Sequence, residues 1–239
     1  IRNHHRLFIT FLPIASKMMR SKKNNDLIIS STTGYSKGFN IKGNFHLAYC
    51  HTILPYAWED EYLKTLPFVP KIFHPITNLG AAYLRNFDKT TLNYINFFIA
   101  NWEFFAQKIK NFYKRDCIMI YPPVDEQKFY YKKPNLEEDY YLMAGRLVYY
   151  KRFDLGIRSF NKLKKKLKIV GDGFAKSNLK SFADSKYIEF IPYVSQSELR
   201  DLYQNAKALI FPQIEHFGLV AAEAQMCGLP ILAFNDGGA

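Results

Sequence analysis

Two glutamates, Glu215 and Glu223, lie on either side of a small apolar stretch, EHFGLVAAEA, near the end of the chain. The stretch follows the strand-like run ALIFPQ, and Gly218 marks the start of a helix that Gly228 and Pro230 terminate. The first amides of such a helix have no partner within it and form its positive pole, so they can bind an anion. Carboxylates accept hydrogen bonds from vicinal hydroxyls. The stretch therefore predicts a site for an anionic sugar ligand.

A structural interpretation of the same glutamates is the alternative. An acid near a helix start is favoured by the helix dipole, and a second acid usually lies on a solvated face. The small apolar residues of AAEAQMCG surround Glu223, and they argue against a solvated face. The pattern therefore favours binding for Glu223.

A second basic motif, GRLVYYKRFD, also follows a strand-like run. Gly145 permits a close backbone approach, and the loop can aim Arg146 and Lys151 at one point. Two such cations would hold a diphosphate, with Arg146 as a planar fork and Lys151 as a point charge. The alternative is that both are ordinary solvated basic residues.

Two weaker candidates also end strand-like runs. Gly171 opens the turn of IVGDGF, whose amides can face a phosphate or a base, although Gly-x-Gly is common in plain turns. His51 ends FHLAYCHT, where it can hydrogen-bond a substrate hydroxyl or a developing charge across an interdomain cleft. The alternative for His51 is a structural role, in which its ring is hydrogen-bonded within the fold.

The elements that must position these residues alternate between strand and helix. In the second half, the predicted strands are 140–147, 167–173, 188–194, 208–213 and 230–234, and the predicted helices are 152–165, 175–184, 195–206 and 218–228. Ser195 with Glu198 three residues later predicts a capping box. Such alternation is typical of a doubly wound parallel sheet, in which ligands lie beyond the carboxyl ends of the strands.

The first half predicts a similar domain. Strands are expected at 26–32, 45–52 and 117–125, and a largely helical pattern from Trp58 to Lys114 holds a further short strand, 97–102. Two prolines, at 122 and 123, suit a hinge. We therefore expect two α/β domains, 1–127 and 128–239. Because the chain starts at Ile1 and stops just after a strand-like run, we also expect both ends of a longer protein to be absent.

Composition restricts the possible partners. The chain has 239 residues, 48% of them hydrophobic, and its three widely spaced cysteines predict buried free thiols in a reducing, cytoplasmic compartment. The net charge of +12 indicates an anionic partner. The lysines of KLKKKLK fit one exposed helix face, and no nucleic-acid-binding motif appears. The segment 17–25, KMMRSKKNN, suits either peripheral contact with anionic lipid or a solvated turn.

Together these motifs resemble the donor half of retaining glycosyltransferases of family 4, which have the GT-B fold. The quoted residues are GRLVYYKRFD, IVGDG, YVSQSEL and EHFGLVAAEAQMCGLPILAF, and in the first half YCHTILPYAW, FIANWEFFAQKIKNFY and MIYPPVD. The first-half motifs resemble bacterial mannosyltransferase-like members that act in O-antigen, capsule or exopolysaccharide assembly. The resemblance implies two Rossmann-like domains with parallel sheets facing a cleft.

The resemblance also implies roles for residues. Arg146 and Lys151, beside Gly145 and Gly171, would hold the donor diphosphate, Glu215 the hydroxyls of the donor sugar, and Glu223 the ribose hydroxyls. His51 would lie near the donor sugar. No metal or other cofactor is expected, since the cations and the helix start replace it. The amides expected to touch phosphate and sugar are those of Phe217, Gly218, Leu219 and Val220.

The expected function is transfer of a hexose to a lipid-linked or oligosaccharide acceptor, with retention of configuration. GDP-mannose is the expected donor, and a UDP-hexose or UDP-N-acetylhexosamine is the alternative. A basic nucleic-acid-binding protein is the alternative from another class, and nucleic acid is not an expected partner. The expected location is the cytoplasm, with peripheral contact at the cytoplasmic membrane face as an option.

Overall fold

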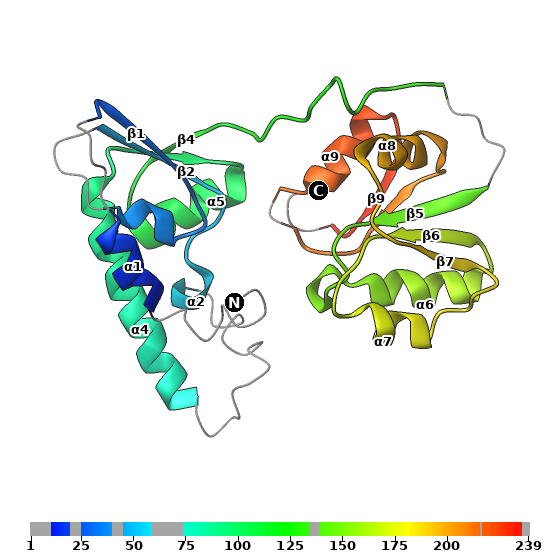
Figure 1. The fold of residues 1–239 in the computed structure, drawn as a ribbon, viewed down its shortest axis with the longest axis horizontal. Helices are drawn as coiled ribbons and strands as arrows, with labels where there is room; N and C mark the ends of the chain where they lie inside the picture. The colour runs from blue at the N-terminus through cyan, green and yellow to red at the C-terminus, as the bar shows by residue number, and fades with distance from the viewer. Residues whose placement is uncertain are drawn as a thin grey trace. The chain divides into compact units, whose positions relative to one another are not determined.

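The chain divides into two units, Ile1–Tyr121 and Pro122–Ala239, each built on a parallel sheet (Figure 1). A computed structural model describes residues 11–19, 25–39, 45–58, 74–133, 139–215 and 217–235. For residues 74–77 it describes the backbone only. The predicted α/β fold with parallel sheets is confirmed in both units.

The sheet of the first unit has the order β1-β2-β3-β4. Its strands are β1 (Leu27–Thr32), β2 (Phe45–Cys50), β3 (Phe97–Ala100) and β4 (Cys117–Met119), all at predicted places. The described helices are α1 (Leu12–Met18), α2 (Pro55–Trp58), α4 (His74–Thr91) and α5 (Glu103–Lys108), which continues as a π-helical turn, η5 (Ile109–Tyr113). Short 3₁₀ turns lie at η2 (Tyr35–Gly38) and η4 (Leu92–Tyr94).

The two faces of this first sheet differ sharply. Because side chains alternate along a strand, Ala48 and Phe98 lie on one face and are fully buried against α5 residues such as Phe105. On the other face, apolar side chains are exposed. Ile29 is 66% exposed, and Phe45 packs beside Phe97 with ring centroids 5.5 Å apart. In the described structure this second face is therefore open and apolar.

The sheet of the second unit has the order β7-β6-β5-β8-β9. Its strands are β5 (Tyr140–Ala144), β6 (Lys166–Val170), β7 (Ile188–Ile191), β8 (Leu209–Phe211) and β9 (Ile231–Ala233). Its helices are α6 (Phe153–Leu163), α7 (Lys176–Ser181), α8 (Gln196–Asn205) and α9 (Leu219–Met226), with a 3₁₀ turn, η6 (Tyr149–Lys151), before α6. The predicted alternation of strand and helix is confirmed along this half.

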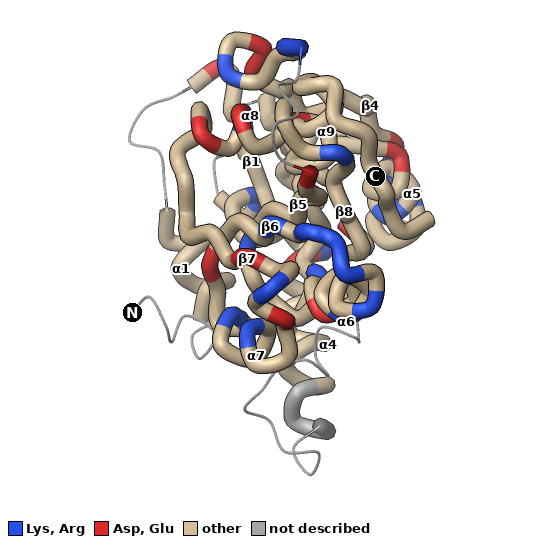
Figure 2. The backbone as a smooth tube through the Cα atoms, turned by 90° about the vertical axis from the view of Figure 1, so that its right-hand side faces the viewer, with Lys and Arg blue, Asp and Glu red and all other residues tan. Residues whose placement is uncertain are grey.

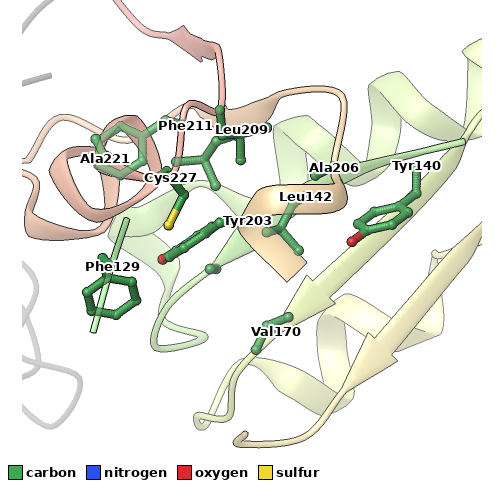
Figure 3. Close-up of a cluster of buried hydrophobic side chains, with 13 residues drawn as sticks. Phe129, Tyr140, Leu142, Val170, Tyr203, Ala206, Leu209, Phe211, Ala221 and Cys227 are labelled. Atoms are coloured by element: carbon green, nitrogen blue, oxygen red, sulfur yellow. The ribbon is translucent and has the colours of Figure 1, made fainter. Parts of the chain in front are cut away.

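Helices cover both faces of the second sheet, with α8 and α9 on one side and α6 and α7 on the other (Figure 1). The alternation within β5 shows why: Leu142 packs into the core beneath α8 and α9, and its neighbour Met143 packs into the core beneath α6 and α7. Figure 3 shows the first of these cores, in which Tyr203 of α8 points toward α9 and Cys227.

The division between the units falls just before the two prolines, after Tyr121. The sequence predicts this division a few residues later, after residue 127. The residues that follow the prolines already pack on the second unit, since Phe129 is buried in its core and Val124 lies against it. The chain therefore packs on the core of the second unit before the first strand of that unit begins.

The surface features of the second unit follow the sequence. The predicted capping box at α8 is confirmed, with Ser195 and Glu198 bonded reciprocally, and these bonds hold the pKa of Glu198 below its ordinary value. Figure 2 shows Lys and Arg along α6 and α7 and in the turn from α6 to β6. Across both units, the three cysteines are free thiols as predicted; Cys50 and Cys227 are buried, whereas Cys117 is partly exposed, contrary to the prediction.

A fully buried ion pair ties the helices of the first unit together. Lys37 Nζ pairs with Asp88, and the two side chains are 1% and 0% exposed. The other oxygen of Asp88 accepts hydrogen bonds from Tyr113 and Trp58, both at 2.7 Å. Tyr113 also accepts from Lys37 at 2.7 Å. Every charge in this cluster is thus compensated, as burial of charge requires.

Replacing Asp88→Asn should destabilise the first unit by about 3 to 5 kcal/mol, because Lys37 would remain charged, buried and unpaired. Urea unfolding followed by tryptophan fluorescence measures this, since Trp58 and Trp102 are the two tryptophans and both lie in the first unit. Asp116→Asn, the same change at an exposed site of that unit, should cost less than about 0.5 kcal/mol. Equal effects of the two variants would contradict a special role for the buried pair.

Candidate functional site at the carboxyl edge of the second sheet

Three neighbouring strands bring the predicted site residues to one edge of the second sheet. Strands β6, β5 and β8 are adjacent and parallel, so the loops that follow them lie at the same edge. These loops hold Gly171, the segment from Gly145 to Lys151, and Glu215. From β5 the chain continues to β6 and β7 on one side of β5, and then crosses to β8 and β9 on the other side. The carboxyl end of β5 is therefore the switch point at which α/β sheets bind ligands.

A direct ion pair joins two of these loops. Lys151 Nζ lies 2.7 Å from Glu215 Oε2, and the side chains are 11% and 20% exposed. Two residues that the sequence analysis assigned to different parts of one ligand therefore contact each other directly.

A third side chain, which the sequence analysis missed, completes this cluster. Gln213 is 2% exposed, and its Nε2 donates to the same oxygen, Glu215 Oε2, at 3.3 Å. Its position two residues after β8, at the edge where ligands bind, was the available signal.

The loop after β5 leaves space beside the Lys151 ammonium. Gly145 has a φ of +139°, and a Cβ built there would lie 3.5 Å from Lys151 Nζ. A side chain at this position would therefore be strained, and its Cβ would lie in van der Waals contact with the cation. Arg146, the next residue, is exposed, and no hydrogen bond or ion pair joins it to another described residue.

The turn at Gly171 has a different environment from the one expected. Gly171 N–H donates to Ile191 O at 3.1 Å, and Gly173 N–H donates to Asp172 Oδ1 at 2.7 Å. A Cβ at Gly171, where φ is +138°, would collide with the carbonyl oxygen of Gly145. Within the structure, Gly171 thus allows two backbone loops to pack closely, and these two amides already have partners.

The start of α9 has amides without intrahelical partners. Gly218 takes the N-cap position with a φ of +80°, and no side chain caps the helix there. The first amide bonded back to Gly218 is that of Ala221, at 2.8 Å, so the amides of Leu219 and Val220 precede the first helical bond. This is the polarity that attracts an anion. Phe217 lies just before the cap and is partly buried, and His216 lies outside the described residues.

Glu223, by contrast, neighbours the core between α8 and α9. Burial raises its pKa above the ordinary value, and the nearby hydroxyl of Tyr203 partly offsets that effect. Burial likewise raises the pKa of Tyr203, with the charge of Glu223 as the next contribution. Tyr203 makes no well-formed hydrogen bond through its hydroxyl with a described residue. The structure therefore joins Glu215 to Lys151 and Gln213, and places Glu223 beside Tyr203.

His51 lies at the carboxyl end of β2, in the first unit. Its Nε2 is 2.7 Å from Ser31 Oγ, and its ring packs edge-on against Tyr49 at 5.1 Å. These contacts also fit the structural alternative, and a role in an interdomain cleft stays a prediction.

No group of three or more His, Cys, Asp or Glu side chains that could hold a metal ion gathers among the described residues. Nor does any helix in the described part of the chain have the length and apolar character needed to cross a bilayer.

Replacing Glu223→Gln should stabilise the protein at pH 7. The native pKa of Glu223 is raised above its unfolded value, so its contribution to stability is present at low pH and is lost as pH rises through the native pKa. The neutral amide avoids this loss. The gain should therefore shrink as the pH falls, which thermal unfolding by circular dichroism at pH 4 and pH 7 would measure.

The matched control has the opposite sign. Because the pKa of Glu198 is lowered in the native state, Glu198→Gln should lose stability at pH 7 and approach wild type in acid. A gain from Glu223→Gln that did not change with pH would argue against a buried, charge-penalised carboxylate.

The second unit is similar to known proteins. Residues 124–239 match the family described as glycosyl transferases group 1. A glycosyltransferase of uncharacterised activity from Haemophilus influenzae is 38% identical over 114 residues, which cover 44% of this chain and 32% of that protein. Alpha-1,3/1,6-mannosyltransferase ALG2 of Debaryomyces hansenii is 26% identical over 223 residues, which cover 89% of this chain and 44% of that protein.

A solved structure is similar in fold. TarM from S. aureus, in complex with Fondaparinux, alpha-GlcNAc-glycerol and UDP, has a TM-score of 0.57 and 18% identity, and the match covers 80% of this chain and 41% of that chain. This likeness fits the predicted GT-B class. The chain matches about a third of the length of the H. influenzae protein and less than half of that of the D. hansenii protein. The residues that match the glycosyl transferases group 1 family, 124–239, thus include the site around Lys151 and Glu215.

Proposed function

We propose that the protein is a retaining glycosyltransferase that takes a hexose from a nucleotide sugar and transfers it to a lipid-linked or oligosaccharide acceptor. The observation that carries this proposal is the Lys151–Glu215 pair at the switch point of the sheet, in the same unit as the uncapped start of α9. A cation and an anion-binding helix start suit a diphosphate, and a carboxylate suits sugar hydroxyls.

The donor diphosphate would lie between the helix start and the two basic side chains. An ammonium has three protons, and Glu215 takes one of those of Lys151, so two remain for phosphate oxygens. Arg146 is exposed and can turn toward the same group. The amides of Leu219 and Val220 would donate from the helix side. Together these groups would stabilise the negative charge that develops as the nucleotide diphosphate leaves.

In the proposed reaction, the bond from the anomeric carbon to the phosphate oxygen breaks, and a bond to the acceptor oxygen forms on the same face. Because the new bond forms on the face from which the phosphate departs, configuration is retained, and the acceptor proton passes to the departing phosphate oxygen. Glu215 would orient the sugar through its hydroxyls, Glu223 would bind the ribose, and His51 would lie near the sugar. No metal enters this proposal, because the cations and the helix start supply the positive charge.

The identity of the donor rests on the relatives. GDP-mannose is the proposed donor, supported by the mannosyltransferase from D. hansenii that matches most of this chain. A UDP-sugar is the second candidate, favoured by the UDP in the complex of the TarM structure. Nucleic-acid binding has less support, because the lysines of the α6–β6 turn lie on an exposed surface without a recognisable nucleic-acid-binding motif.

Peripheral contact with anionic lipid is proposed for the end of α1. Met18 and Met19 are 75% and 56% exposed beside Lys17, a mixture of apolar and basic groups that suits a membrane surface. Residues 20–24 of the same segment lie outside the described residues. The proposed location is therefore the cytoplasm, at the face of a membrane that holds the acceptor.

Calorimetric titration with GDP- and UDP-sugars tests the proposed donor. Arg146→Ala should weaken binding of the preferred donor by roughly 10- to 100-fold, because a charge-assisted phosphate contact is lost. Glu223→Ala should also remove most of the affinity, without unfolding the protein.

Lys162→Ala is the matched control for Arg146→Ala. It removes the same charge from the last turn of α6, at the opposite edge of the sheet, and should leave donor binding unchanged. Unchanged affinity in both the Arg146 and Glu223 variants would remove the site assignment, and retention on nucleic acid that ignores added nucleotide sugar would favour the other class.

A further inference from the structure

Gln213 is a buried amide whose side chain is fixed against the predicted sugar-binding carboxylate. The residue is 2% exposed and lies two positions after β8, which ends at Phe211. Its Nε2 donates to Glu215 Oε2 at 3.3 Å. Burying an amide costs free energy unless it is hydrogen-bonded, so this contact has a reason to persist.

The two donors on Glu215 reach the same oxygen. Lys151 Nζ lies 2.7 Å from Oε2, and Gln213 also donates to Oε2, whereas no described residue donates to Oε1. Among the described residues, the carboxylate is thus held along one side, and its other oxygen is available to a ligand. A carboxylate oxygen accepts hydrogen bonds only, so the ligand group must be a donor such as a hydroxyl.

In the proposed function Lys151 binds both the diphosphate and Glu215, whereas Gln213 binds Glu215 only. When a diphosphate arrives, the ammonium is shared between the phosphate oxygens and Glu215. The amide of Gln213 is neutral and gains little from an anion nearby. It can therefore keep Glu215 oriented while Lys151 interacts with the diphosphate.

We propose that Gln213 is a positioning residue that holds Glu215 Oε2, so that Oε1 alone accepts a hydrogen bond from one hydroxyl of the donor sugar. This inference rests on the proposed function and deepens it. It assigns to Glu215 one hydroxyl of the hexose, where the sequence suggested a vicinal diol.

The test separates the sugar from the nucleotide. Gln213→Leu removes the amide donor at nearly constant volume, and it should weaken binding of the preferred nucleotide sugar by about 3- to 10-fold. Binding of the nucleoside diphosphate without the sugar should stay unchanged, because its contacts are with Lys151, Arg146 and the start of α9. A residue with a merely structural role would affect both ligands alike.

Gln213→Glu adds a readout in pH. At neutral pH the new carboxylate should repel Glu215 and lower the affinity for the nucleotide sugar, relative to wild type. As the pH falls, the new side chain is protonated and regains a donor O–H, so the affinity should recover toward the wild-type value at the same pH. Gln213→Leu has no such group and should show no recovery.

Gln204→Leu is the matched control. Gln204 is a second buried glutamine of the same unit, 7% exposed, whose Nε2 donates to Tyr130 O at 2.7 Å. Its loss should lower thermal stability and leave the ratio of the two affinities as in wild type.

Two results would overturn the role of Gln213: equal binding of the nucleotide sugar by Gln213→Leu and wild type, or equal weakening of nucleotide sugar and nucleoside diphosphate. Failure of the proposed function looks different. Wild-type protein would then bind no nucleotide sugar in the panel, and the assignment of Gln213 would fall with it.

Discussion

The candidate site depends on one contact between loops that are distant in sequence, the ion pair of Lys151 with Glu215. The two residues are 64 positions apart, and only the adjacency of β5 and β8 in the sheet brings them together. Since both side chains are largely buried, neither charge would be stable there alone. The pair therefore keeps a cation and an anion in place at the sheet edge.

Buried charged side chains have different partners at three places in the chain. The Lys37–Asp88 pair is closed to solvent and satisfied by Tyr113 and Trp58, which suits a purely structural role. In the Lys151–Glu215 pair, one carboxylate oxygen accepts no hydrogen bond from a described residue, which leaves capacity for a ligand. No cation among the described residues pairs with Glu223, and its burial raises its pKa. A residue that costs stability in this way is consistent with selection for binding.

The elements of the second unit were predictable because each apolar run has its own period and clear turn residues. The alternation from 140 to 234 predicted β5 to β9 and α6 to α9, and the Ser195 capping box fixed the start of α8. Contacts between loops were not predictable in the same way. The sequence near Gln213 does not predict that its amide turns toward Glu215, because that orientation depends on how the residues after β8 pack. The bonded amides of the Gly171 turn and the position of Glu223 beside Tyr203 likewise depend on neighbouring elements.

The apolar face of the first sheet, which is open among the described residues, has a consequence for the behaviour of the protein in solution. Strand β1 is the edge of the described sheet, and Leu27 and Ile29 are 50% and 66% exposed along it, next to Phe45. An apolar edge strand is a template for pairing with another copy, and mutual repulsion from the net charge of +12 opposes that pairing. Since repulsion is screened over about 10 Å at 0.1 M salt, colloidal stability is expected to fall as ionic strength rises, with dilute buffers keeping the protein dispersed.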